Sequence, residues 1–133
     1  MMNILILDSD SSIQETLEMF FREKGHAVVT CSSGREALAW RDRASPDVAI
    51  VDSGLPDIDG MDLLDCLRAV FPETRVLVII PQGDEEAWKE AEKRGAWGWI
   101  EEPLDVEDLE CGLDQVTRPA TARSRESGAE RGL

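Results

Sequence analysis

Two aspartates in this 133-residue chain each follow directly after an apolar run, a position from which a carboxylate can bind a ligand. Asp8 follows Ile4-Leu5-Ile6-Leu7, and Asp52 follows Val48-Ala49-Ile50-Val51. Two carboxylates that lie close together repel each other unless a proton or a cation lies between them. If the two runs are neighbouring strands, the pair predicts a site for a hard divalent cation. The competing interpretation is that both are ordinary loop residues, because Asp is common in turns.

The elements that would position these aspartates alternate regularly along the chain. Continuous apolar runs are typical of strands that are covered on both faces, and apolar residues spaced by three and four are typical of helices. We predict strands at residues 3–7, 27–31, 48–51, 76–80 and 97–100. We predict helices at residues 12–24, 33–44, 61–70, 84–94 and 106–116. Five strand–helix repeats predict a three-layer α/β/α architecture, with a parallel sheet between two layers of helices.

Two local patterns refine this prediction. Ser12-Ile13-Gln14-Glu15 has the form of a capping box and places the start of the first helix at Ser12. Trp97 and Trp99 are two residues apart on the predicted fifth strand. Because side chains alternate between the faces of a strand, we expect both indoles on the same side of the sheet.

In a sheet of this kind, ligands bind beyond the carboxyl ends of the strands. The residues found there are Asp8-Ser9-Asp10 after the first strand and Asp52-Ser53-Gly54 after the third. The fourth strand ends in Ile80-Pro81, and the fifth is followed by Glu101-Glu102-Pro103.

At this point four segments, in order, resemble the receiver domains of two-component response regulators. Residues 4–8 resemble the opening strand and first acid of that family, and residues 46–60 resemble its phospho-acceptor strand and following loop. Lys93-Arg94-Gly95-Ala96 and Glu102-Pro103 resemble its "KAGA" and "KP" elements. The resemblance covers residues 3–116. It implies a flavodoxin-like, doubly wound sheet of order 2-1-3-4-5 and a cis peptide bond before Pro103.

The resemblance also assigns roles to residues around the paired aspartates. Asp52 matches the phospho-acceptor position. Asp8, Asp52 and the main-chain carbonyl of Gly54 match the positions that hold Mg²⁺, and Glu102 is a further candidate ligand for a weakly bound cation. The switch positions of the family fall on Ile80, Trp99, Glu102 and Pro103.

Three residues depart from the family pattern. Ser9 stands where the second metal-site acid is usual, Ile80 replaces the hydroxyl residue that grips the phosphoryl group, and Glu102 replaces the lysine. Phosphoryl transfer depends on positioning and on neutralising the phosphoryl oxygens. A carboxylate about 5 Å from another costs roughly 3 kcal/mol at an effective dielectric near ~20. We therefore expect a phosphorylated state of low stability that is weakly coupled to any conformational change.

Three functions follow as alternatives. The first is a phosphorelay receiver that is phosphorylated on Asp52 by a histidine kinase or phosphotransfer protein. The second is a degenerate receiver that binds partners independently of phosphorylation. The third is a phosphatase of the haloacid-dehalogenase type, suggested by Asp8-Ser9-Asp10 after an apolar strand. The third lacks a lysine at the end of strand four or five and room for a cap domain, so we expect no enzyme.

Composition limits the partners. The net charge of −14 opposes direct binding to nucleic acid or to an anionic membrane surface. No apolar run approaches the roughly 18 residues of a membrane span, and the N-terminus has no basic region typical of a signal peptide. We expect a cytoplasmic protein whose receiver domain is residues 1–116, with residues 117–133 as a flexible tail or linker. The resemblance places an output domain or partner on the face of the fourth helix, fifth strand and fifth helix, and leaves a homodimer open.

Overall fold

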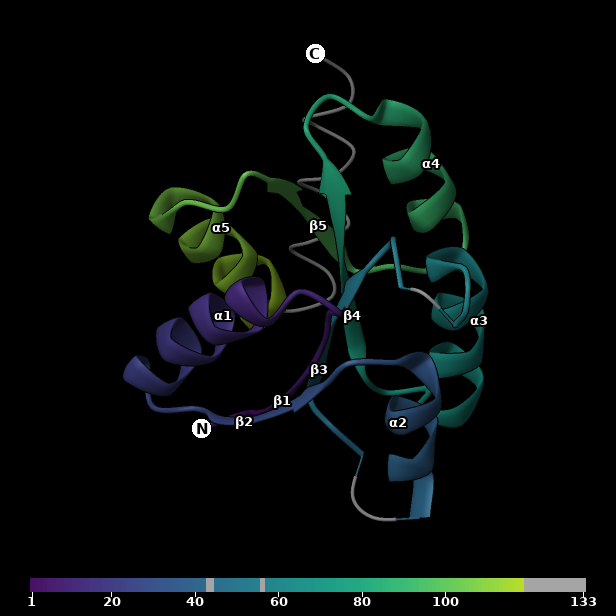
Figure 1. Cartoon of the computed structure of the whole chain (residues 1–133), viewed down its shortest axis with the longest axis horizontal. Coiled ribbons are helices and arrows are strands. Elements are labelled where there is room, and N and C mark those ends of the chain that lie inside the picture. The colour runs from purple at the N-terminus through teal and green to yellow at the C-terminus, as the bar shows by residue number, and fades with distance from the viewer. Residues whose placement is uncertain (43–44, 56, 119–133) are drawn as a thin grey trace.

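The apolar runs form one parallel sheet at the centre of the computed structural model, which describes residues 1–42, 45–55 and 57–118 (Figure 1). The strands are β1 (Asn3–Leu7), β2 (Ala27–Cys31), β3 (Val48–Asp52), β4 (Arg75–Pro81) and β5 (Gly98–Glu102). Their order is β2-β1-β3-β4-β5, and every neighbouring pair is parallel. The predicted architecture and strand order are therefore confirmed.

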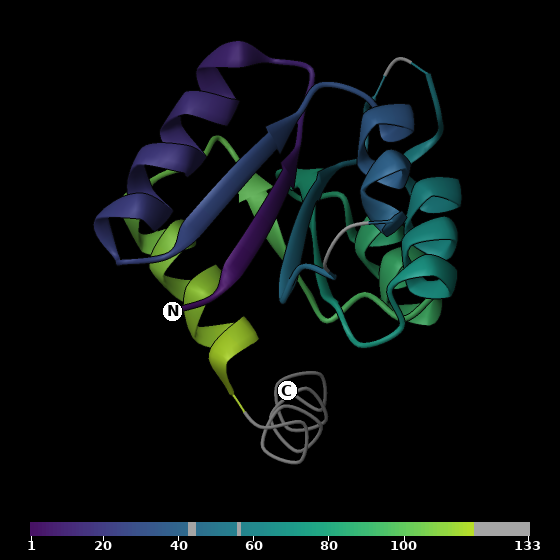
Figure 2. The same cartoon turned by 90° about the horizontal axis from the view of Figure 1, so that it is seen from below.

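Helices cover both faces of this sheet. They are α1 (Ser11–Glu23), α2 (Gly34–Leu38), α3 (Gly60–Val70), α4 (Glu85–Lys93) and α5 (Val106–Thr117). The views in Figures 1 and 2 place α1 and α5 on one face and α2, α3 and α4 on the other. In the described part of the chain, no helix combines the length and the apolar character that crossing a bilayer would need.

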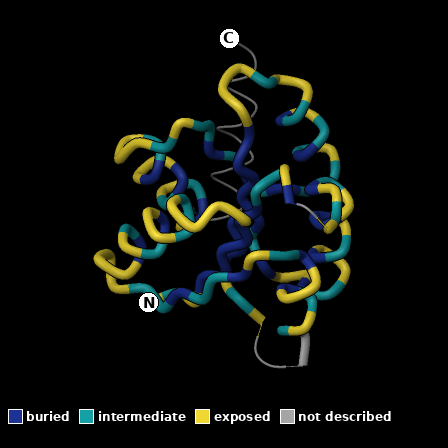
Figure 3. Tube along the Cα trace, in the orientation of Figure 1, coloured by how far each residue is buried: buried dark blue, intermediate teal, exposed yellow. Residues whose placement is uncertain are grey.

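The core consists of two hydrophobic clusters, one on each face of the sheet. Alternate residues of the same strand belong to opposite clusters. In β1, Leu5 and Leu7 face α2 and α3, while Ile4 and Ile6 face α1 and α5. Figure 3 shows the buried residues concentrated on the strands and on the inner sides of the helices. Burial of the strands on both faces explains why they read as unbroken apolar runs in the sequence.

Two helix boundaries differ from the prediction. The N-cap of α1 is Asp10, whose carboxylate accepts hydrogen bonds from the main-chain N–H groups of Ser12 and Ile13 at 2.8 and 3.3 Å. The predicted capping box at Ser12 is therefore wrong, because a carboxylate two residues earlier already caps the helix. The second helix is α-helical only to Leu38 and continues as a 3₁₀ turn over Ala39–Asp42, and its predicted end at residues 43–44 lies outside the described residues.

The two tryptophans that the sequence placed on the fifth strand, Trp97 and Trp99, lie on opposite sides of the sheet, so the prediction that they share a side is wrong. β5 begins only at Gly98, and the alternation of side chains does not extend to Trp97 before it. Trp99 packs against the cluster beneath α2, α3 and α4, while Trp97 packs against the cluster beneath α1 and α5.

Trp97 helps to hold the end of α5 against the sheet. Its indole N–H donates to the main-chain oxygen of Gln115 at 2.6 Å, and the guanidinium of Arg75 lies 4.1 Å from the centre of its ring. Arg75 also donates to the main-chain oxygens of Val116 and Arg118 at 2.6 and 2.7 Å. A cation there satisfies terminal carbonyls of the helix and complements its dipole. The predicted tail from residue 117 lies almost wholly outside the described residues, which end at Arg118.

Candidate functional site

Asp8 and Asp52 meet at the carboxyl edge of the sheet. Leu7 pairs with Val51 in the register of β1 and β3, so the residues that follow them are brought side by side. Glu102 ends β5, next to the end of β4. The charges of Asp52 and Glu102 both act on Asp8. The structure thus brings together the three acids that the sequence placed at this edge.

The carboxyl group of Asp8 is fully buried, with 0% of the residue exposed. Its Oδ1 accepts a hydrogen bond from Asp10 N at 2.8 Å, while its Oδ2 has no hydrogen-bond partner among the described residues. Burial, opposed by the bond from Asp10 N and reinforced by the charges of Asp52 and Glu102, raises the pKa of Asp8 to about 7. An orphaned buried oxygen next to a second carboxylate is an arrangement that favours a proton or a cation.

Asp52 is half-buried and turned toward its own loop. Its Oδ1 accepts a hydrogen bond from Gly54 N at 3.0 Å. The loop is pressed against the start of α3, because a Cβ added to Gly60 would lie 2.5 Å from the Cα of Ser53. Glycine is therefore required at Gly60 for this close approach.

A second tie holds the same loop to α2. The carboxylate of Asp57 accepts hydrogen bonds from Gly34 N at 3.0 Å and Arg35 N at 3.1 Å. The bond from Gly34 N is the largest influence lowering the pKa of Asp57 below its usual range. Sequence reasoning missed this tie. The one available signal was an Asp–x–Asp pattern in a loop, which does not name the helix it would contact.

The three departures from the family pattern have distinct structural settings. Ile80 is only 2% exposed and packs in the cluster beneath α2, α3 and α4, while Ser9 is exposed. Glu102 is half-buried, and burial together with the charges of Asp52 and Asp10 raises its pKa. The Glu102–Pro103 peptide bond is cis, as the resemblance implied.

No group of three or more His, Cys, Asp or Glu side chains is placed to hold a metal ion within residues 1–42, 45–55 and 57–118. A cation at this edge would therefore depend on two aspartates, a main-chain oxygen and water. Asp10, the other acid of the first loop, is engaged as the cap of α1. The unpartnered Oδ2 of Asp8 still fits a hard cation, since oxygen is the ligand that Mg²⁺ prefers.

The face formed by α4 and β5 contains a stacked pair of indoles. The rings of Trp88 and Trp99 lie 3.9 Å apart between centroids, with an angle of 30° between their planes. Trp99 Nε1 donates to Glu101 Oε1 at 3.3 Å, and Gly83 N donates to Glu101 Oε2 at 3.4 Å. The Glu101 carboxylate thus bridges the loop before α4 and the indole of Trp99, a connection that sequence reasoning missed.

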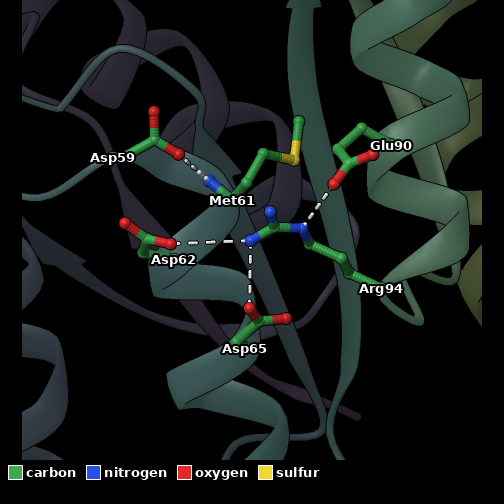
Figure 4. Close-up of polar contacts among 6 residues, drawn as sticks. All are labelled: Asp59, Met61, Asp62, Asp65, Glu90 and Arg94. Atoms are coloured by element: carbon green, nitrogen blue, oxygen red, sulfur yellow. Dashed lines mark hydrogen bonds and ion pairs between the residues drawn. The ribbon is translucent and has the colours of Figure 1, made fainter.

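Ion pairs of Arg94 connect α4 to α3, and we call this group the ionic clamp (Figure 4). Arg94 follows α4, and its guanidinium contacts Glu90 of α4 at 2.8 Å. It also lies 2.9 Å from Asp65 and 3.5 Å from Asp62, both on α3. Sequence reasoning found Arg94 only as part of the "KAGA"-like element. Glu90 lies four residues before it, but the two partners on α3 are not signalled by local spacing.

A parallel sheet of order 2-1-3-4-5, covered by helices on both faces and with its polar site at the carboxyl edge, defines the flavodoxin-like class of α/β proteins. The family model of the response regulator receiver domain matches residues 4–113. The chain belongs to this family, whose members are the receiver domains of two-component signalling.

Individual proteins agree with this assignment. The chemotaxis response regulator CheY4 of Vibrio cholerae superposes with a TM-score of 0.80 at 30% identity, over 87% of this chain and 98% of that one. The probable transcriptional regulatory protein TcrX of Mycobacterium tuberculosis is 28% identical over 96% of this chain and 54% of its own length. The virulence transcriptional regulatory protein PhoP of Salmonella typhimurium is 29% identical over 89% of this chain and 53% of its own length. The chain thus spans about half the length of these two regulators.

Proposed function

We propose that this receiver domain carries its phospho-acceptor at Asp52 and that its switch chemistry is weakened. The observation that supports this proposal best is the buried carboxylate of Asp8, whose Oδ2 has no partner among the described residues and which lies beside Asp52. Such a pair is suited to a cation and, through it, to an incoming phosphoryl group. The domain acts as a signalling module of the phosphorelay and not as an enzyme.

The residues present fit Mg²⁺. Asp8, Asp52 and the main-chain carbonyl of Gly54 would hold it. Glu102 adds negative charge near the site but is not placed as a third acidic ligand among the described residues. Bound there, Mg²⁺ supplies positive charge that neutralises the phosphoryl oxygens. Because the pKa of Asp8 is raised to about 7, cation binding near neutral pH competes with a proton on that carboxyl.

Two neighbours weaken the phosphorylated state. Ile80 supplies no hydroxyl, which forgoes a charge-assisted hydrogen bond of about 1.5 to 3 kcal/mol. Glu102 brings a negative charge to the site in place of a lysine. A ligand shifts a conformational equilibrium only through contacts that differ between the two states. Without these contacts, phosphorylation of Asp52 shifts the conformational equilibrium of the α4–β5 face only slightly.

The partners proposed follow the family. A histidine kinase or phosphotransfer protein in the cytoplasm would deliver the phosphoryl group to Asp52. An output domain or partner protein would bind the face formed by α4, β5 and α5. The net charge of −14 makes this domain itself a poor surface for nucleic acid.

The test is phosphorylation by acetyl phosphate in the presence of Mg²⁺, measured as a mass increase of the intact chain. We expect slow, incomplete labelling that is abolished in Asp52→Asn, without a change in Trp99 fluorescence. The combined variant Ser9→Asp, Ile80→Thr, Glu102→Lys restores the family residues and should label faster and gain a donor-dependent signal from Trp99. If the unmodified chain labels rapidly and Trp99 responds as strongly as in the variant, the weakened-switch proposal is wrong.

The second candidate is a receiver that binds its partner independently of phosphorylation. It is favoured by the bridge from Glu101 to Gly83 and Trp99 and by the Trp88–Trp99 stack, which hold the α4–β5 face in one arrangement. Absence of any label on Asp52 would select this candidate. A phosphatase of the haloacid-dehalogenase type is the weaker alternative, because the carboxylate of Asp10 is engaged in capping α1. Release of phosphate from a generic phosphomonoester would be needed to support it.

A further inference from the structure

The α4–β5 face contains a groove whose lining combines aromatic rings with carboxylates. The groove has a volume of about 520 Å³. Its apolar part is formed by Ile80 and by the stacked indoles of Trp88 and Trp99. Its polar part is formed by three acids and one lysine, namely Asp84, Glu85, Glu101 and Lys89.

The charges of this groove favour a cationic guest. Among the residues that line it, acids outnumber the single Lys89, and the chain as a whole carries a net charge of −14. The face of an indole attracts a cation through its ring quadrupole, and tryptophan does so most strongly among the aromatic residues. A groove with this mixed lining would therefore accept a side chain that is flat, partly apolar and positively charged.

Glu101 is placed to bind the head of such a side chain. Both of its hydrogen bonds are long, 3.3 Å from Trp99 Nε1 and 3.4 Å from Gly83 N. An ionised carboxylate has about four lone-pair sites, so Glu101 retains acceptor capacity beyond these two bonds. The exposed carboxylate of Glu85 lies on the same groove.

We propose that this groove binds an arginine side chain of a partner protein, with the guanidinium against the Trp99 indole and hydrogen-bonded to Glu101. Arginine fits better than lysine, because its planar guanidinium stacks on aromatic rings and donates two parallel hydrogen bonds to one carboxylate. The inference deepens the proposed partner face and rests on it. It does not require phosphorylation of Asp52, because the Trp88–Trp99 stack and the hydrogen bonds of Glu101 that shape the groove are contacts within the protein itself.

The experiment uses the ¹⁵N-labelled full chain at constant ionic strength and a short peptide, acetyl-Gly-Arg-Gly-amide. Matched peptides carry lysine or the neutral isostere citrulline in place of arginine. We expect the arginine peptide to shift the Trp99 indole N–H and Gly83 amide resonances, and to bind about three- to tenfold more tightly than the citrulline peptide. The lysine peptide should bind with intermediate affinity.

Variants locate the binding. Glu101→Gln should weaken arginine binding. Glu85→Gln should weaken it too, and this second variant leaves the Trp99–Glu101 hydrogen bond in place, so it tests the proposal even if Glu101→Gln alters the loop. Glu15→Gln removes one charge from the exposed surface of α1 and should leave binding unchanged. Equal shifts with citrulline, shifts that map away from Trp99 and Gly83, or affinity unchanged in both groove variants would each overturn the proposal.

The phosphorylation assay separates the two proposals. A chain that binds arginine in the groove but never labels on Asp52 retains this inference and loses the phospho-acceptor role. A chain that labels on Asp52 while the Trp99 and Gly83 resonances stay fixed with all three peptides loses this inference and retains the acceptor.

Discussion

Asp8 is the residue whose ionisation should dominate the response of the site to pH. Its carboxyl is buried beside Asp52, and its pKa is raised to about 7 from an ordinary value of 3.8. A carboxyl whose pKa is higher in the folded than in the unfolded state stabilises the fold while it is protonated. That contribution is complete below about pH 4 and is lost as the pH rises through 7.

Asp8→Asn should remove the loss of stability that accompanies ionisation of Asp8 as the pH rises. We expect the variant to exceed the unmodified chain in free energy of unfolding by on the order of 3 kcal/mol at pH 8, with a smaller difference at pH 5. Urea unfolding at the two pH values, in metal-free buffer, measures the effect. Glu15→Gln is the control, because Glu15 is exposed on α1 and should not alter the slope between pH 5 and 8. A parallel pH dependence in Asp8→Asn and the unmodified chain would contradict the assignment.

At the scale of elements, the loop after Asp52 depends on how closely α3 approaches it. A Cβ at Gly60 would lie 2.5 Å from Ser53 Cα and 2.9 Å from Ser53 O, both main-chain atoms that cannot rotate away. A Cβ at Gly54 would lie 3.7 Å from Asp52 Oδ1, an ordinary contact. Gly54 in the loop and Gly60 at the start of α3 therefore differ sharply in whether they tolerate a Cβ.

Gly60→Ala should destabilise the fold by about 1 to 3 kcal/mol and reduce the labelling of Asp52 under the proposed function, because the main chain next to Asp52 must move. Gly54→Ala should leave stability within about 0.5 kcal/mol. Thermal or urea unfolding together with acetyl phosphate labelling checks both. Equal stability of the two variants would show that the α3 approach is less tight than the structure indicates.

The clamp at Arg94 makes a separate prediction for α4. Arg94→Ala breaks the contacts to Asp62 and Asp65 of α3 and to Glu90 of α4. We expect faster amide hydrogen exchange in α4 than in the unmodified chain, with β4 unaffected. Arg94→Lys keeps the charge but lacks the forked guanidinium and should give intermediate exchange. Exchange in α4 that is unchanged in Arg94→Ala would mean that core packing through Trp88 and Ala91 holds this helix without the clamp.

How far the sequence predicted these elements depended on the range of the interactions that determine them. Unbroken apolar runs were enough for the strands, and parallel strands were enough to bring Asp8 next to Asp52. The side of Trp97 was predicted wrongly because the strand begins one residue later, at Gly98. The contacts of Arg94 with Asp65 of α3 and of Glu101 with Gly83 were missed, because they join residues 29 and 18 positions apart. No local periodicity signals side-chain contacts of that separation.

At the scale of the whole molecule, the charge imbalance should make stability depend on salt. The chain has 28 acidic residues against 14 Lys and Arg, so the folded state concentrates repulsion that the unfolded chain relieves. Raising NaCl from 10 to 150 mM shortens the screening length to about 8 Å. We expect the free energy of unfolding at pH 8 to rise by about 1 kcal/mol.

Mg²⁺ should stabilise the fold beyond this general screening effect, by binding between Asp8 and Asp52. At constant ionic strength, millimolar Mg²⁺ should stabilise the unmodified chain beyond the level reached with NaCl and should alter Trp99 fluorescence. Asp8→Asn should show the NaCl effect alone. An identical response of the two chains to Mg²⁺ would argue against a cation between Asp8 and Asp52.

The bonds of Arg75 also determine how the molecule would carry mechanical load. Arg75 begins β4, a strand with neighbours on both sides, and its guanidinium grips the oxygens of Val116 and Arg118. A pull along the strand axis at the end of α5 would therefore reach the interior of the sheet before it could peel the helix away. β4 would resist that pull by shear, with its hydrogen bonds to β3 and β5 loaded together instead of one after another. The end of α5 is thus the point at which tension on this domain would be transmitted to a strand that has neighbours on both sides.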